Sequence, residues 1–127
     1  MIATSSLLTA SASFETGAGL ALMSFPKTAM RLLLGTEPRG AGVAATRALG
    51  LGLLSLGLAC LPRRRARHRL ASLRAVRALL AYNAVAAAGL SLVRATGRYR
   101  GIALMPAVVL HAAFTGLFAG RARRART

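Results

Sequence analysis

The chain has 127 residues, enough for one domain, and carries 18 Lys and Arg against two acidic residues, for a formal net charge of +16. It is also 55% hydrophobic, and the two properties coexist because the basic residues cluster between long uncharged segments. A soluble domain of this size could not cover so much apolar surface, whereas lipid covers it for a membrane protein. The single cysteine, Cys60, excludes an intramolecular disulfide.

Four apolar segments follow one another along the chain, and each is long enough to cross a hydrocarbon core of about 30 Å as a helix. They cover residues 5–25, 41–61, 75–93 and 102–119. Because the links between them are short, neighbouring helices should be antiparallel. The sequence therefore predicts an all-α, integral membrane four-helix bundle with up-down topology, formed by residues 1–127 as a single membrane domain.

The first segment contains one of the two glutamates, Glu15, within an apolar run of small residues. A glutamate at the centre of a span costs about 3 kcal/mol on insertion, which cancels the contribution of the surrounding leucines. This segment should therefore insert well only when Glu15 is protonated or paired. Pro26 ends the segment, and residues 27–35 then predict a short amphipathic helix, either lying in the membrane interface or serving as a plain connector.

Small residues form stripes on the second and third segments, at intervals of three and four residues. Such stripes allow helix backbones to approach closely in lipid, so we expect them to pack within one chain or between chains. The stripes consist of Ala41, Ala45, Ala48, Gly52, Ser55 and Ala59, and of Ala81, Ala84, Ala88, Ser91 and Ala95. In the fourth segment, Pro106 predicts either a bent first turn or a kink.

The basic residues of the links predict the orientation, because cytoplasmic loops carry an excess of Lys and Arg. Ten lie in the link between the second and third segments and in the basic C-terminal tail over 121–127, against six in the two other links. Both termini should therefore be cytoplasmic, in a protein of the cytoplasmic membrane. The basic side should also bind anionic lipid headgroups, through Arg63, Arg64, Arg65, Arg67, Arg69, Arg121, Arg123 and Arg124.

Each predicted helix offers one strongly polar side chain at a similar depth, and these are Glu15, Arg47, Asn83 and His111. Counting 1.5 Å per residue puts Arg47 about 5 Å from Glu15 along the membrane normal, within reach of the arginine side chain. We therefore predict that Arg47 balances Glu15 and that the other two form hydrogen bonds, with Tyr82 and Thr115 extending the set. Such an interior polar site either serves a function or only fixes the helix register.

Several of these residues give the chain a resemblance to the small bacterial four-helix membrane proteins grouped as DoxX-like, and to related families of unknown function. The likeness covers most of the chain. It consists of Pro26 followed by "RLLLG" at 31–35, "TRALGLGLLSLGL" from Thr46 with Arg47, Gly50 and Gly57, and then Asn83 and His111. The resemblance implies a four-helix bundle in the cytoplasmic membrane and brings no settled activity.

The central glutamate of the first segment is also similar to that of the small multidrug-resistance transporters, in which this carboxylate exchanges protons for a cationic substrate. Against this comparison, the chain has no Trp and few aromatic residues to surround a lipophilic cation, and Arg47 would repel one. A proton-coupled small-molecule transporter that uses Glu15 is therefore the alternative function.

The remaining motifs argue against several classes of function. The chain has no Asp, no motif with Ser beside His and no metal-ligand spacing, so we expect no enzymatic activity, metal or cofactor. The basic runs lack interleaved aromatic residues, so we expect no nucleic acid partner. The main prediction is a small polytopic inner-membrane protein, acting as an accessory or structural component, with a second copy or another membrane protein as a possible partner.

Overall fold

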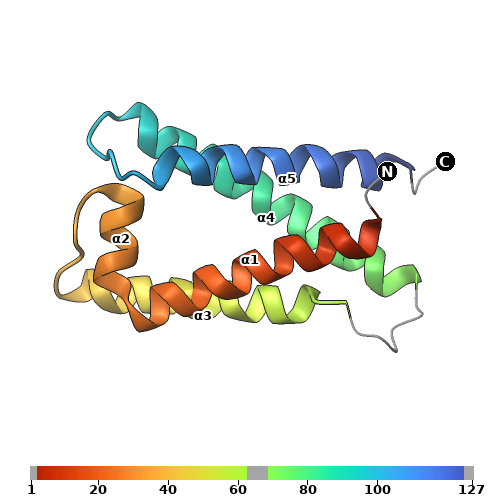
Figure 1. The fold of residues 1–127 in the computed structure, drawn as a ribbon, viewed down its shortest axis with the longest axis horizontal. Helices are drawn as coiled ribbons and strands as arrows, with labels where there is room; N and C mark the ends of the chain where they lie inside the picture. The colour runs from red at the N-terminus through yellow and green to blue at the C-terminus, as the bar shows by residue number, and fades with distance from the viewer. Residues whose placement is uncertain (1–2, 63–68, 125–127) are drawn as a thin grey trace.

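The computed structural model describes residues 3–62 and 69–124, and this part of the chain is all-α, which confirms the predicted fold class at that level (Figure 1). Its helices are α1 (Thr4–Ser24), α2 (Pro26–Leu34), α3 (Ala41–Cys60), α4 (Arg69–Ala95) and α5 (Leu104–Arg124). The last two are longer than the apolar segments that predicted them. Arginine is a good helix former, and cations are favoured at a helix C-terminus, so α5 continues into the predicted basic tail.

Proline and glycine residues mark several helix ends. Pro26 is the first residue of α2 and disfavours a helical Phe25, so α1 ends at Ser24. Gly35 ends α2 in the left-handed region, with φ 78°, and its N–H donates to the carbonyl of Arg31. Pro106 lies in the first turn of α5, where its missing N–H costs no hydrogen bond of the helix.

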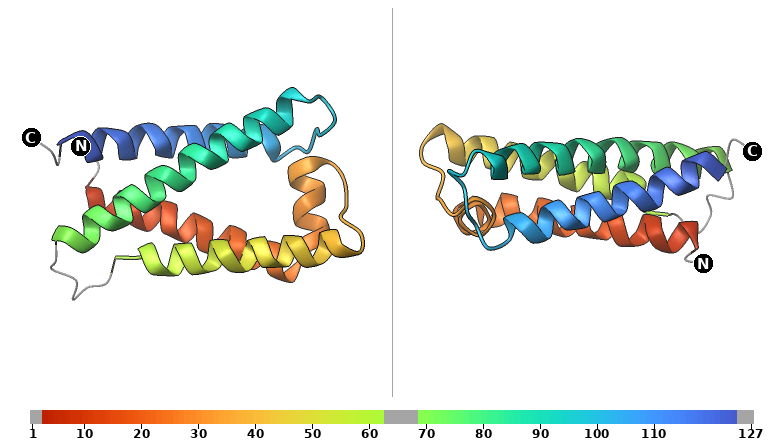
Figure 2. Two further views of the ribbon diagram at one scale, coloured as in Figure 1. Left: turned by 180° about the vertical axis from the view of Figure 1, so that it is seen from behind. Right: turned by 90° about the horizontal axis from the view of Figure 1, so that it is seen from above.

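The four long helices form two pairs, since α1 packs mainly on α3 and α4 packs mainly on α5. Figures 1 and 2 show α2 lying across the long helices at one end of the molecule. The first turn of α1 and the last turn of α5 meet at the opposite end, where Arg121 donates a hydrogen bond to the Thr4 hydroxyl at 2.9 Å.

The loop between α4 and α5 ties α2 to the second helix pair. The N–H groups of Arg100 and Ala103 donate to the carbonyls of Leu34 and Leu32, at 3.2 and 2.9 Å. These bonds satisfy two carbonyls at the C-terminal end of α2 that lack partners within the helix. Gly101 permits this contact, because a Cβ at this position would clash with the α2 backbone.

Glycines bring α1 and α3 into backbone contact. A Cβ built on Gly19 would lie 2.5 Å from the Leu54 nitrogen, and one on Gly50 would lie 2.7 Å from the Gly19 carbonyl oxygen. A Cβ on Gly57 would clash with α1 as well. This contact has the close backbone approach that small residues permit between membrane helices.

The small-residue stripe predicted on the second segment does not make this contact. All six of its members are exposed, whereas the buried face of α3 lies beside it and consists of Thr46, Gly50, Leu53, Gly57 and Cys60. Only glycine lets the two backbones touch, so the glycines Gly50 and Gly57 decide which face of α3 packs on α1. Of the two arrangements expected for this stripe, the structure excludes packing on α1 within the chain, and packing between chains stays a prediction.

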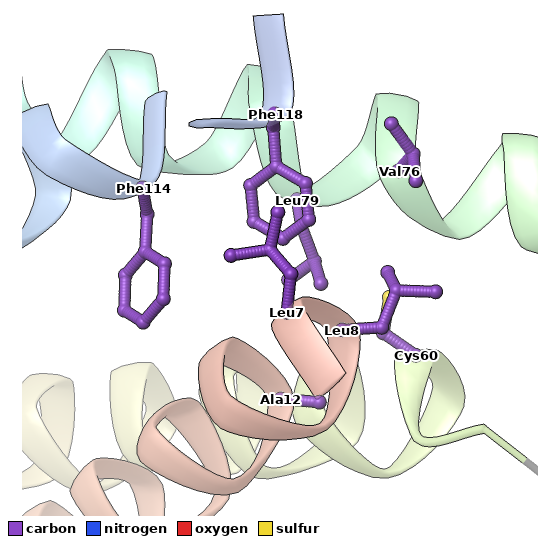
Figure 3. Packing of buried hydrophobic residues seen from close by; sticks show 8 residues of the cluster. All are labelled: Leu7, Leu8, Ala12, Cys60, Val76, Leu79, Phe114 and Phe118. Atoms are coloured by element: carbon purple, nitrogen blue, oxygen red, sulfur yellow. The ribbon is translucent and has the colours of Figure 1, made fainter. Parts of the chain in front are cut away.

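An apolar cluster joins the two helix pairs near the end where the first and last helical turns meet. Figure 3 shows Leu7, Leu8 and Ala12 of α1 and Cys60 of α3 facing Val76, Leu79, Phe114 and Phe118 of the other pair. Leu79 and Phe118 are fully buried. Side chains of this size make many close van der Waals contacts, so the cluster stabilises one arrangement of the two pairs.

By length and composition, three helical segments of the described part of the chain are apolar enough to cross a membrane, namely Ala41–Cys60, Leu73–Ala95 and Leu104–Arg124. Their outward faces are apolar, and Leu51, Val85 and Val109 have exposed fractions of 53%, 73% and 60%. These features indicate a membrane protein. The helix α1 is of similar length but is not one of these segments, since Ser, Thr and Glu15 interrupt its leucines.

Candidate interior polar site

Polar side chains from three helices meet between the two helix pairs. Ser11 and Glu15 lie one turn apart on α1, and both are fully buried. Asn83 of α4 is also fully buried, and His111 of α5 is 5% exposed. We call these four residues the interior polar site. Buried polar groups are costly unless they are hydrogen-bonded, so the partners of each side chain decide what the site can do.

Asn83 is the centre of the hydrogen-bond network. Its Nδ2 donates to the Leu79 carbonyl at 2.8 Å and to the Ser11 hydroxyl at 3.4 Å. Its Oδ1 lies 2.8 Å from Nδ1 of His111. Because an amide oxygen only accepts, His111 must donate its Nδ1–H here, and the other ring nitrogen of a neutral His111 is then an acceptor. Asn83 therefore selects the tautomer and orientation of the imidazole.

Glu15 is the least satisfied member of the site. Its Oε1 lies 3.9 Å from Nδ1 of His111, which is within ion-pair distance but too long for a hydrogen bond. The Tyr82 hydroxyl also interacts with the carboxyl group, yet neither Glu15 oxygen accepts a hydrogen bond of good geometry from the described residues. A buried carboxyl group without such bonds is rare in folded proteins and calls for a functional or structural reason.

Aromatic rings surround the imidazole of His111. Tyr82 and Phe14 each form a T-shaped ring contact with it, with centroid separations of 5.6 and 6.0 Å. Tyr82 is therefore close to both ionisable members of the site, as predicted for an extension of the set. The other predicted extension, Thr115, uses its hydroxyl for the His111 carbonyl one helical turn back, at 2.7 Å.

The structure contradicts the predicted pairing of Arg47 with Glu15. Contacts of Gly57 with Ala12 and Thr16 place Glu15 level with Gly57 on α3, and Arg47 is ten residues earlier on that helix, about 15 Å away. Arg47 is also exposed, because its neighbours Thr46 and Gly50 occupy the face that packs on α1. The prediction assumed that both segments begin at matching depths, whereas the glycine contacts set a different register.

Ser11 is the one member of the site that the sequence did not single out. It precedes Glu15 by four residues, so both lie on the same face of α1. That spacing was the available signal, and the many Ser and Thr residues of the first segment obscured it. Among the described residues, no three His, Cys or acidic side chains gather as a metal site requires.

The residues predicted to bind anionic lipid lie partly outside the part of the chain that the structure describes. Arg63, Arg64, Arg65 and Arg67 fall in the gap between α3 and α4, and Arg69 begins α4. In the last turn of α5, Arg123 and Arg124 are exposed, and the half-buried Arg121 contacts Thr4. The described members therefore cluster at the end of the molecule opposite α2.

Comparisons with known proteins give no further assignment. No protein-family model, no curated protein and no solved structure matches this chain. The function must therefore be argued from the residues and the geometry of the fold.

Proposed function

We propose that this chain is a small multi-pass protein of the cytoplasmic membrane, in which α1, α3, α4 and α5 cross the bilayer as a four-helix bundle. One observation supports this above all: ionisable and amide side chains are buried between the helices, while large apolar side chains are exposed on the outside. Glu15 and Asn83 are fully buried, whereas Val85 is 73% exposed and Leu51 is 53% exposed. In water this distribution would be unfavourable, but in lipid it places apolar side chains against acyl chains and polar ones in the bundle.

In the proposed orientation both termini face the cytoplasm, and α2 lies in the opposite interface. The basic residues at the end away from α2 would then meet the anionic inner leaflet, where each contributes about 1 kcal/mol. The short α2 has the pattern of an interfacial helix, since it lies across the long helices (Figure 2) and its Lys27 and Arg31 are exposed.

Cysteine labelling tests this topology. In a Cys60→Ser background, Thr36→Cys should react with a membrane-impermeant maleimide in intact cells, and Ala3→Cys should react only after lysis. Both positions are exposed, so the membrane alone decides the difference. Equal labelling of both cysteines in intact cells, or extraction of the protein by alkaline washing, would contradict the proposal.

The role that we propose is that of a non-enzymatic accessory or structural component, organised around the interior polar site. The Asn83 network supports it, because a hydrogen-bonded set that joins α1, α4 and α5 holds the two helix pairs in one arrangement. The DoxX-like resemblance is compatible with this role. Mild detergent extraction with a C-terminal tag should recover a second copy or one stoichiometric membrane protein, whereas recovery of a lone monomer would contradict an accessory role.

A second candidate is a proton-coupled small-molecule transporter, and the environment of Glu15 favours it. Among the described residues, neither carboxyl oxygen accepts a hydrogen bond of good geometry and no arginine forms an ion pair with the group, so the carboxyl group is available to bind and release a proton. Reconstituted vesicles should then show solute uptake that depends on a pH gradient. Glu15→Gln should abolish the uptake, and Glu37→Gln, at the exposed second acid, should preserve it.

A further inference from the structure

The structure leaves Arg47 without the partner that was predicted for it, Glu15. It is the seventh residue of α3, on the outward face of a helix apolar enough to cross a membrane. The chain has only two acidic residues. Glu15 is buried in the interior polar site, and Glu37 pairs with Arg31 at 3.1 Å. No further acidic side chain exists to balance Arg47, so a negative group that pairs with it would have to come from outside the chain.

A cavity of about 240 Å³ lies beside Arg47, where α1 turns into α2 and both pass α3. Its lining combines two cations, Lys27 and Arg47, with the apolar side chains of Phe25, Pro26 and Val43. We call this cavity the corner site. Phe25 is 68% exposed, so an apolar surface continues outward from the cavity. The lining thus offers positive charge and apolar contact together, which suits an amphipathic anion rather than a small hydrated one.

We propose that the corner site binds one phospholipid, with the phosphodiester held by Lys27 and Arg47 and an acyl chain lying along Phe25 and Val43. This inference rests on the proposed function only in that the helices must span a membrane. Arg47 is about 9 Å along α3 from its first residue, and a long arginine side chain covers that depth to reach the headgroup level. The guanidinium group also matches a phosphate with two parallel hydrogen bonds.

The corner site is separate from the basic side already predicted to meet anionic lipid. It lies at the α2 end of the molecule, and in the proposed orientation it faces the outer leaflet (Figure 1). There, one lipid held in a defined cavity would also brace the sharp turn between α1 and α2 against α3.

Native mass spectrometry of the purified full chain tests this site. The probes are dioleoyl phosphatidylglycerol, dioleoylglycerol, which has the same acyl chains without phosphate, and inorganic phosphate. The Lys27→Gln/Arg47→Gln variant should bind phosphatidylglycerol at least about tenfold more weakly than the original protein. The control, Arg39→Gln/Arg94→Gln, removes the same charge from exposed residues outside the cavity and should bind as the original does.

Three results would overturn the proposal. Equally weakened phosphatidylglycerol binding in both double variants would show diffuse charge attraction. Binding of dioleoylglycerol as tight as that of phosphatidylglycerol would show that the phosphate is not recognised. Competition by inorganic phosphate at concentrations similar to the lipid's would show a site for free anions. Should the double variant not fold, Arg47→Lys keeps the charge and loses the bidentate contact, so it should still bind phosphatidylglycerol several-fold more weakly, and unchanged binding would contradict the proposal. Correct cysteine labelling together with any of these results would reject the corner site alone and leave the membrane topology standing.

Discussion

Glu15 and Arg47 were expected to neutralise each other, but Glu15 of α1 lies level with Gly57 of α3, about ten residues along that helix from Arg47. This separation has a measurable consequence. Glu15→Gln and Arg47→Gln should change the free energy of unfolding independently, with a coupling energy within about 0.5 kcal/mol. Reversible unfolding in detergent, measured for both single variants and the double variant, gives this value. Glu15→Gln with His111→Phe is the positive control, because those side chains lie 3.9 Å apart and should couple by about 0.5–3 kcal/mol.

Asn83 should contribute more to stability than any exposed polar residue of α4. Asn83→Leu leaves the Nδ1–H of His111 and the Ser11 hydroxyl without their partner, which should cost about 1–3 kcal/mol of unfolding free energy. Ser91→Leu, at an exposed position of the same helix, should change it by less than about 0.5 kcal/mol. Adding His111→Phe to Asn83→Leu should recover part of the loss, because both partners are then apolar. No recovery would show that the loss comes from packing.

At this scale, the sequence predicted the depth of three members of the set correctly and was wrong about both the depth and the direction of Arg47. Every helical residue advances the chain by 1.5 Å, so helix length alone placed Glu15, Asn83 and His111 at one level, and the structure brings these three together. The direction of Arg47 depended on which face of α3 packs on α1. That choice is made by backbone contacts of Gly19, Gly50 and Gly57 with the partner helix, and no local pattern identifies the partner.

At the scale of the helix pair, the unfolding free energy should depend on where on α3 a side chain is added, and much less on the chemical type of that side chain. Gly57→Val forces a side chain into the α1 backbone and should lower the unfolding free energy by at least about 1–3 kcal/mol. Gly52→Val is the matched control, because nothing lies within 4 Å of a Cβ at Gly52. Thermal unfolding of both variants in detergent gives the comparison, and an equal loss of unfolding free energy would show that the Gly57 face is not the only packed face of α3.

Helix boundaries followed from elementary signals where proline or glycine was present, as at Pro26 and Gly35. They were less predictable where charged residues continue a helix beyond its apolar part. Hydropathy marks only the membrane-spanning section, so Arg69 and Arg124, as the first residue of α4 and the last residue of α5, lay outside the predicted ranges. The exposed small-residue stripe of α3 shows a related limit of sequence patterns, because small residues permit close packing but do not require it.

At the scale of the whole molecule, the fold is two helix pairs joined by α2, by the apolar cluster and by the Asn83 network. The sequence could not predict this pairing, because segments of similar length and apolarity permit several arrangements of the same up-down chain. The pairing also explains where the polar side chains are buried. Within each pair the two helices pack closely on one another, and the interior polar site lies between the pairs, where Asn83 joins them by hydrogen bonds.

The pairing predicts that the chain can be divided between Arg65 and Ala66 and still assemble. Each half then holds a complete pair, α1 with α3 or α4 with α5, so co-expressed halves should co-purify through a tag on one of them. Leu79→Ala with Phe118→Ala should reduce recovery of the untagged half, since both side chains are fully buried between the pairs and each truncation costs about 2–5 kcal/mol. Leu92→Ala, at a residue that is 70% exposed, should not reduce it. Failure of the unaltered halves to associate would mean that the covalent link, rather than the buried interface, holds the two pairs together.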